Sequence, residues 1–293
     1  MSDFEVREIK IGEENYPPLL REIPKAPEIL YARGNAALDA EFWARPLVAI
    51  VGTRKATNYG LKVARELARE LAARGVVVVS GLAFGIDAAA HRGALEASGT
   101  TLAILGSGVN QLYPTANADL ARELMDRGGA VLSEFAPDFP PDKWTFPQRN
   151  RIVAGLTQAT IVIEAPEKSG ALITAYLALD FNREVGAVPG EITSVNSTGT
   201  NALLRRGAAL IRNADDVFEL LGEIRSEDSE QATLFDNCDE IEQIILQCLI
   251  APKSREALTT ETSLPAETLG AKLTMLELKG AIENKNGLFR KIL

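Results

Sequence analysis

The feature that most constrains the fold is an alternation that begins at residue 46, in which short aliphatic runs are separated by longer segments of helical period. The chain has seven such runs, at 47–51, 76–79, 101–105, 130–132, 160–165, 184–188 and 208–211. Uninterrupted apolar strands separated by helices are typical of a parallel sheet that is covered on both faces. Residues 46–221 are therefore predicted to form one α/β domain, doubly wound around a mostly parallel sheet.

The segment between the first two runs shows the helical period directly. Val63, Leu67 and Leu71 recur every four residues, and Gly75 follows where the helix should end. This spacing places the apolar side chains on one face. The segment is predicted to be a crossover helix packed on the sheet.

The regions outside this domain have different patterns. Residues 1–45 are rich in proline, lack a sustained period and are predicted to be an extended lead-in. Residues 222–240 resemble a solvated acidic linker. Residues 241–293 indicate three helices, the third opened by Pro265, and a hairpin turning at Asn286-Gly287. Three helices and a two-stranded wing predict a winged helix-turn-helix domain.

The net charge of -9 argues at first against nucleic acid, because most nucleic-acid-binding domains are basic. The distribution changes that interpretation. Residues 222–240 carry seven acids and one base, whereas residues 36–221 carry 20 acids and 18 bases and residues 241–293 carry six acids and seven bases. The domains are close to neutral, so nucleic-acid binding would require a few bases focused on a narrow site.

Composition excludes several other classes. The chain has two cysteines, Cys238 and Cys248, and one histidine, which is too few ligands for a structural zinc site or a disulfide framework. No apolar run approaches the ~20 residues that cross a bilayer, and the first residues lack a signal-peptide pattern. We expect a cytoplasmic protein without a metal or other cofactor.

Glycine and serine follow several of the predicted strands. The loops are Val51-Gly52-Thr53-Arg54, Ser80-Gly81, Gly106-Ser107-Gly108 and Lys168-Ser169-Gly170. The carboxyl ends of parallel strands share one edge, and small residues there let backbone amides approach a phosphate. An anionic ligand is predicted, although glycines also end strands in α/β proteins generally. Neither the Gly-x-Gly-x-x-Gly pattern nor the Gly-Lys-Ser/Thr loop is present, so NAD or ATP binding is not indicated.

Residues 143–151, Lys-Trp-Thr-Phe-Pro-Gln-Arg-Asn-Arg, interleave aromatic and basic side chains. Aromatic rings stack on bases, and ammonium or guanidinium groups hold phosphates, so the segment is typical of single-stranded nucleic-acid binding. Asn150 and Arg151 could instead be structural and bond neighbouring loops.

Two further groups of residues have simple explanations. Asp87 and His91 are four residues apart on a predicted helix, but no matched nucleophile accompanies them, which favours a capping carboxylate and a packed imidazole over a catalytic pair. The C-terminal segment supplies only a few bases, Lys272, Lys279, Lys285, Arg290 and Lys291. That supply is thin for duplex DNA, so protein contact or packing is an equal alternative.

Taken together, these motifs resemble the DprA family, also called Smf, of DNA-processing proteins. The resemblance rests on eight ordered stretches: VAIVGTRKATNYG, VVVVSGLAFGIDAAAHRGAL, TLAILGSGVNQLYPTAN, AVLSEF, FPQRNRIVAGL, EKSGALITA, AVPG and GTNALLRRGAAL. It implies an extended Rossmann-like fold that binds single-stranded DNA cooperatively as a dimer. It also implies that the protein protects incoming strands and helps to load the recombinase RecA in natural transformation.

The resemblance assigns DNA contacts but no catalytic residue. It implies that Arg54 and Lys143 hold the DNA backbone and that Phe146 stacks on a base. The remaining implied contacts line the same edge of the sheet: Ser80, Gly81, Ser107, Gly108, Arg149, Asn150, Arg151, Lys168, Ser169 and Gly170.

Dimerisation is expected through the apolar stretch Ala208–Leu221. Many members also carry an N-terminal helical domain, which the first 45 residues here would not accommodate. The alternative is a Rossmann-like nucleotide-processing enzyme related to phosphoribohydrolases, which place a catalytic glutamate in the helix after a glycine-rich loop. Residues 168–175 contain no carboxylate, which argues against that alternative.

Overall fold

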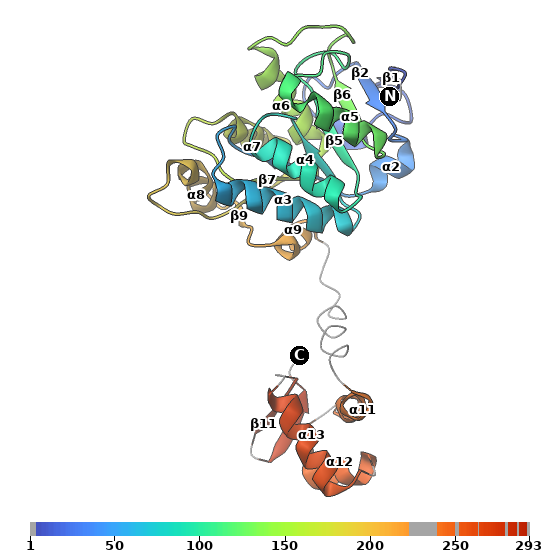
Figure 1. Ribbon diagram of the computed structural model, residues 1–293, viewed down its shortest axis with the longest axis vertical. Helices are drawn as coiled ribbons and strands as arrows, with labels where there is room; N and C mark the ends of the chain where they lie inside the picture. Colours follow the sequence, from blue (N-terminus) through green and yellow to red (C-terminus); the bar gives the residue numbers. More distant parts are fainter. Residues whose placement is uncertain are drawn as a thin grey trace. The chain divides into compact units, whose positions relative to one another are not determined.

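The computed structural model describes residues 4–222, 239–249, 252–262, 264–278, 281–285 and 287–291 (Figure 1). The chain divides into two compact units, Met1–Glu223 and Ile224–Leu293. Most of the predicted acidic linker, including Cys238, lies outside the described residues. No helix of the described residues is long and apolar enough to cross a membrane.

The first unit contains a nine-stranded sheet in the order β1-β2-β6-β5-β4-β3-β7-β8-β9. The strands are β1 (Arg7–Lys10), β2 (Ile29–Gly34), β3 (Leu47–Val51), β4 (Val77–Ser80), β5 (Thr101–Ile104), β6 (Ala130–Ser133), β7 (Ala159–Val162), β8 (Glu184–Ala187) and β9 (Ala209–Leu210). Every pairing between strands β3 to β9 is parallel, which confirms the predicted mostly parallel sheet. The strand order reverses at β3, which lies between β4 and β7, and ligands in such sheets bind outside the carboxyl ends of the strands at the reversal.

Helices cover both faces of this sheet (Figure 1). They are α1 (Pro18–Arg21), α2 (Ala40–Ala44), α3 (Asn58–Ala73), α4 (Ile86–Glu96), α5 (Ala118–Asp126), α6 (Thr145–Leu156), α7 (Gly170–Asp180), α8 (Thr198–Arg205) and α9 (Ala214–Leu220). Alternate residues of β3 enter different cores. Val48 and Ile50 pack in a cluster with α3, α4 and α9, whereas Ala49 and Val51 pack in a cluster with α6 and α7. Burial on both faces explains the uninterrupted apolar runs.

The lead-in contains more regular structure than the sequence predicted. Strand β2 pairs antiparallel with β6, and β1 pairs antiparallel with β2, so the lead-in extends the sheet. Two buried aromatic residues fix it. The Tyr16 hydroxyl donates to the Pro27 carbonyl at 2.8 Å, and the Trp43 indole N–H donates to the Asn15 carbonyl at 2.8 Å. These strands escaped prediction because only one residue of β1, Ile9, is buried.

The second unit contains α11 (Glu240–Cys248), α12 (Arg255–Thr262) and α13 (Ala266–Leu278). A three-stranded antiparallel sheet joins β10 (Lys253–Ser254), β12 (Leu288–Lys291) and β11 (Ile282–Lys285), in that order. The three helices and the hairpin match the prediction, and the two-residue strand β10 was not foreseen. Gly287 has a φ of +82°, which suits glycine in the turn, while Asn286 lies outside the described residues.

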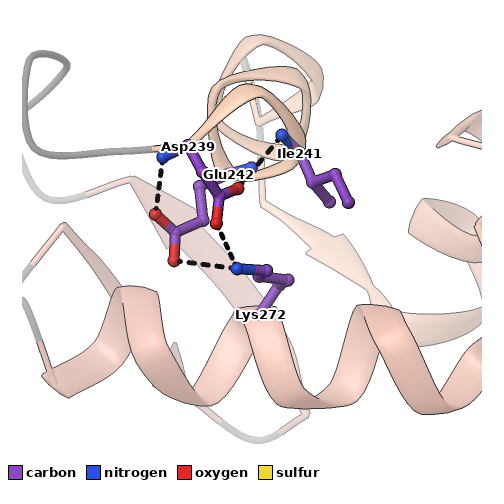
Figure 2. Close-up of polar contacts among 4 residues, drawn as sticks. All are labelled: Asp239, Ile241, Glu242 and Lys272. Carbon is purple, nitrogen blue, oxygen red and sulfur yellow. Dashed lines mark hydrogen bonds and ion pairs between the residues drawn. The ribbon is translucent and has the colours of Figure 1, made fainter.

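An ionic cluster joins the start of α11 to α13 (Figure 2). Asp239 and Glu242 form a capping box, and the Lys272 ammonium group is hydrogen-bonded to Asp239 and lies 3.7 Å from Glu242. In the hairpin, Lys285 and Arg290 both pair with Glu283. These three bases are therefore engaged within the unit, which reduces the charge available to duplex DNA. Lys279 lies outside the described residues.

Candidate functional site

A cavity of about 630 Å³ opens at the carboxyl edge of the sheet, beside the ends of β3, β4 and β7. The sequence analysis placed most of its ligand contacts at this edge, and nine of the predicted residues line the cavity: Arg54, Gly81, Lys143, Phe146, Arg149, Asn150, Lys168, Ser169 and Gly170. They come from the loops after β3, β4, β6 and β7 and from α6 and α7. The topology therefore brings together side chains that are far apart in the sequence.

Arg149 joins α6 to the ends of two central strands. Its side chain is buried, and Nη1 donates to the Gly81 carbonyl at 2.8 Å and to the Ile104 carbonyl. Burial lowers the pKa of the guanidinium group to about 10, so Arg149 is still charged at neutral pH. It supplies a fixed positive charge to the wall of the cavity.

Asp87 is the acidic residue among the described residues that line the cavity. The residue is 6% exposed, and its carboxylate accepts hydrogen bonds from the Gly81 amide at 3.1 Å and the Ala83 amide at 3.4 Å. Burial raises the pKa of this carboxyl group, and the charge of Arg149 opposes that shift. Asp87 holds the loop between β4 and α4 in place.

His91 lies on the same helix but does not line the cavity. The imidazole is fully buried, with Nδ1 at 2.7 Å from the Thr101 hydroxyl. Burial lowers the pKa of the imidazole to about 3, which keeps it neutral. Asp87 and His91 therefore occupy different environments and make no contact that would couple them chemically.

Aromatic side chains form one wall of the cavity and also line a small pocket that adjoins it. The Phe146 ring lies 5.4 Å from the Arg54 guanidinium carbon and 5.6 Å from the centre of the Tyr113 ring. Phe84, which is 47% exposed, lines a small adjoining pocket with these three residues. The sequence analysis missed Tyr113 and Phe84. The sequence feature that could have indicated them is their position: Tyr113 lies in the loop after the third predicted strand, and Phe84 lies in the loop after the second.

Further residues of the lining come from the starts of α6 and α7. Lys143 and Lys168 are exposed and precede these helices. Asn150 donates to the Gly170 carbonyl at 3.3 Å, which ties the two helices together, and Ser169 caps α7 by accepting from the Ala171 amide. Asn150 thus has a structural partner and also faces the cavity, so both of its proposed roles have a physical basis.

Four of the predicted residues do not line the cavity. The buried Ser80 hydroxyl donates to the Ile50 carbonyl at 2.7 Å, and the buried Ser107 hydroxyl donates to the Gln111 carbonyl at 2.6 Å. Gly108 packs against the backbone of Ala136 and Pro137, where a Cβ atom would lie 2.1 Å from an oxygen. Arg151 pairs with Glu134, and both side chains are largely buried. These residues shape the loops around the cavity.

The sequence model of DNA recombination-mediator protein A matches residues 7–222, which include every residue of this cavity. The chain belongs to the DNA recombination-mediator protein A (DprA) family. DNA processing protein DprA of Bacillus subtilis is 41% identical over 218 residues, covering 74% of this chain and 72% of the relative. The resemblance inferred from the sequence motifs is confirmed.

Two solved structures have the same DprA fold. The DprA structure from Streptococcus pneumoniae has a TM-score of 0.68 and 39% identity, covering 73% of this chain and 74% of that one. The DprA structure from Helicobacter pylori has a TM-score of 0.66 and 34% identity, covering 75% of this chain and 97% of that one. The latter was described for its single-stranded DNA binding mode.

Proposed function

We propose that this DprA family member binds single-stranded DNA in the cavity at the carboxyl edge of the sheet. The observation that carries the proposal is the position of Arg54 over the Phe146 ring, in a cavity that Lys143 also lines. A cation next to a stacking surface matches one repeating unit of a nucleic-acid strand, a phosphate and a base. The single-stranded DNA binding described for the Helicobacter pylori relative supports the same ligand.

The lining favours a single strand over a duplex. Phe146, Tyr113 and Phe84 offer faces to unstacked bases, each stack contributing ~1–3 kcal/mol, and paired bases would not expose those faces. Arg54, Lys143 and Lys168 offer charges to the phosphates. The aromatic contacts are sequence-tolerant because every base has a π face.

The test is the affinity of Arg54→Ala and Lys143→Ala for oligo-dT, measured by fluorescence anisotropy at several salt concentrations. Each variant should bind roughly 10-fold or more weakly, and its log–log salt slope should fall by about 0.7. Arg122→Ala on α5, an exposed arginine outside the cavity, is the matched control and should bind like wild type. Wild-type binding by both cavity variants would refute the site.

We propose further that the bound strand is protected from nucleases and passed to RecA, within DNA processing during natural transformation. The resemblance to the DprA family supports this role. RecA-dependent strand exchange on oligonucleotides coated with a single-strand-binding protein tests it. Wild-type protein should accelerate exchange, and Arg54→Ala should not. Equal acceleration by both proteins would show that RecA loading does not require DNA binding in the cavity.

A homodimer through the late part of the first unit is also proposed. Strand β9 is the edge of the sheet, and Leu210 on it is 50% exposed. Tyr176 and Leu179 on α7 are also exposed and line a neighbouring pocket with Ala208. Exposed apolar side chains on neighbouring elements are typical of an interface. Light scattering with and without oligo-dT measures the dimer directly.

The proposed role is non-enzymatic. The first turn of α7, where a phosphoribohydrolase-like enzyme would place its glutamate, begins Gly170-Ala171-Leu172, and the cavity carboxylate Asp87 is engaged by two backbone amides. Incubation of purified protein with purine nucleoside monophosphates should release no free base. Release that is abolished by Asp87→Asn would replace the binding proposal with an enzymatic one.

A further inference from the structure

A second groove, separate from the cavity, lies between α3 and α4. It has a volume of about 510 Å³. Its lining carries four bases and two acids, a net of two positive charges, together with two apolar residues: Leu61, Lys62, Arg65, Glu66, Arg69, Ala89, Arg92 and Glu96. The first unit as a whole carries more acids than bases, 28 against 23, so this is a local concentration of positive charge.

The bases of this α3–α4 groove are not all neutralised. Arg65 donates to Glu96 at 2.6 Å through Nε, and Lys62 lies 3.9 Å from Glu66. Arg69 and Arg92 are exposed and form no hydrogen bond or ion pair with any residue in the part of the chain that the structure describes. These two guanidinium groups remain available to an anionic ligand.

The α3–α4 groove lies on the two helices that begin beside the cavity, although the groove and the cavity share no lining residue. Helix α4 begins beside the cavity, where Asp87 lines the wall, and Arg92 follows five residues later, about 7.5 Å along the helix axis. Helix α3 begins four residues after Arg54. Both helices run away from the carboxyl edge, side by side on one face of the sheet (Figure 1). A chain that leaves the cavity past Arg54 would therefore enter this groove.

We propose that the α3–α4 groove holds the phosphate backbone of the single strand where it continues beyond the cavity, with Arg69 and Arg92 as the contacts. The proposal rests on the proposed binding of single-stranded DNA. The groove lining favours contact with the phosphate backbone of the DNA over contact with its bases. The cavity wall presents aromatic rings on which bases can stack, whereas the groove presents guanidinium and ammonium groups and no aromatic ring. The cavity would fix the strand, and the groove would lengthen the binding site.

The experiment compares oligo-dT of about 6 and of about 20 nucleotides, one near the lower end and one beyond the upper end of the ~4–16 nucleotides typical of single-strand sites. The double variant Arg69→Ala/Arg92→Ala should bind the long oligonucleotide roughly 5- to 20-fold more weakly and reduce its log–log salt slope by about 1.4. Its affinity for the short one should stay within about 2-fold, because the cavity is intact.

Lys10→Ala/Arg122→Ala removes the same charge from β1 and α5 and is the matched control. Equal loss of long-oligonucleotide binding in this control would show a general charge effect and overturn the proposal. So would wild-type binding by the groove variant, or equal loss at both lengths. Arg54→Ala separates the two proposals: if it weakens both lengths while the groove variant weakens neither, only the groove assignment fails.

Discussion

The guanidinium carbon of Arg54 lies 5.4 Å from the centre of the Phe146 ring, although the two residues come from the loop after β3 and from the first turn of α6. The contact places a positive charge on the face of the ring, where the aromatic quadrupole is attractive. It also holds the ring and the cation at the same end of the cavity. A bound strand would meet both groups together, so their contributions to affinity should be coupled.

A double-mutant cycle tests this coupling. Arg54→Ala removes a phosphate contact, and Phe146→Leu removes a base stack at a cost of about 1–3 kcal/mol of oligo-dT binding. The double variant should lose about 0.5–1 kcal/mol less than the sum of the single losses, because each single change already frees the other side chain from the position in which the cation–π contact holds it for binding. Binding titrations of the four proteins at one salt concentration give the coupling. Additive losses would mean that the two groups act independently.

Gly81 and Gly170 both line the cavity and offer a matched pair of glycine substitutions. A Cβ atom at Gly81 would lie 2.4 Å from the Arg149 guanidinium nitrogens, whereas a Cβ atom at Gly170 would meet nothing within 4 Å. Gly81→Ala should displace Arg149, lower stability by about 1–3 kcal/mol and weaken oligo-dT binding. Gly170→Ala should leave stability within about 0.5 kcal/mol of wild type. Urea unfolding of both variants and of wild type measures the two changes in unfolding free energy.

The sequence predicted strands β3 to β9 from continuous apolar runs such as Leu47–Val51, which is buried throughout, although Leu210 on the edge strand β9 is 50% exposed. It did not predict β1 and β2, whose antiparallel pairing at the sheet edge needs few apolar residues. The edge strand β1 depends on β2 as its partner, and β2 depends on β6, and neither pairing is visible in a local pattern.

The site was predictable to the extent that topology determines it. Loops after parallel strands share an edge, so Arg54, Gly81 and Lys168 could be grouped before the structure was known. The direction in which a hydroxyl group points could not be predicted in this way. Ser80 ends a strand and Ser107 follows one, as expected, yet both donate to backbone carbonyls within the fold. Whether such a residue faces ligand or backbone depends on packing that has no sequence pattern.

The single histidine predicts a pH dependence of stability. The pKa of His91 is about 3 in the folded protein and ~6.5 in the unfolded chain, so the unfolded state binds more protons between these values. Stability from His91 is complete above pH 6.5 and falls as the pH decreases towards 3, by about 2 kcal/mol between pH 7 and pH 5. Asp87, whose folded pKa is raised, acts in the opposite direction.

Comparison with His91→Gln isolates the effect, since Asp87 is present in both proteins. Urea unfolding of each at pH 7 and pH 5 gives the two differences in unfolding free energy. The wild-type protein should lose about 2 kcal/mol more than the variant on acidification. Equal losses would mean that the imidazole takes up a proton in the folded state.

Substitution of the exposed leucines on and beside β9 should disrupt dimer assembly without disrupting folding. Leu179 and Leu210 are each 50% exposed, so Leu179→Glu/Leu210→Glu should change monomer stability by less than about 1 kcal/mol. It should convert a dimer to a monomer, because two buried carboxylates per copy would face an apolar partner. Light scattering measures the mass, and Tyr59→Ser, at another exposed aromatic residue, serves as the control. A dimeric double variant would place the interface elsewhere.

The Arg151–Glu134 pair allows a test of whether Arg151 has a structural role or contacts DNA. The side chains are 16% and 10% exposed, and Gln148 also donates to Glu134 at 3.0 Å. Glu134→Gln would leave the Arg151 charge buried without its counter-ion, at a cost of about 3–5 kcal/mol, whereas loss of the surface pair of Arg122 and Asp119 should cost about 0–1 kcal/mol.

Replacing both partners distinguishes the two roles. Glu134→Leu/Arg151→Met removes both charges and keeps the volume, so it should recover most of the stability lost in Glu134→Gln. Neither residue lines the cavity, so the double variant should bind oligo-dT within about 2-fold of wild type at a temperature at which both are folded. Loss of binding in a stable double variant would instead make Arg151 a DNA contact and would extend the site beyond the cavity.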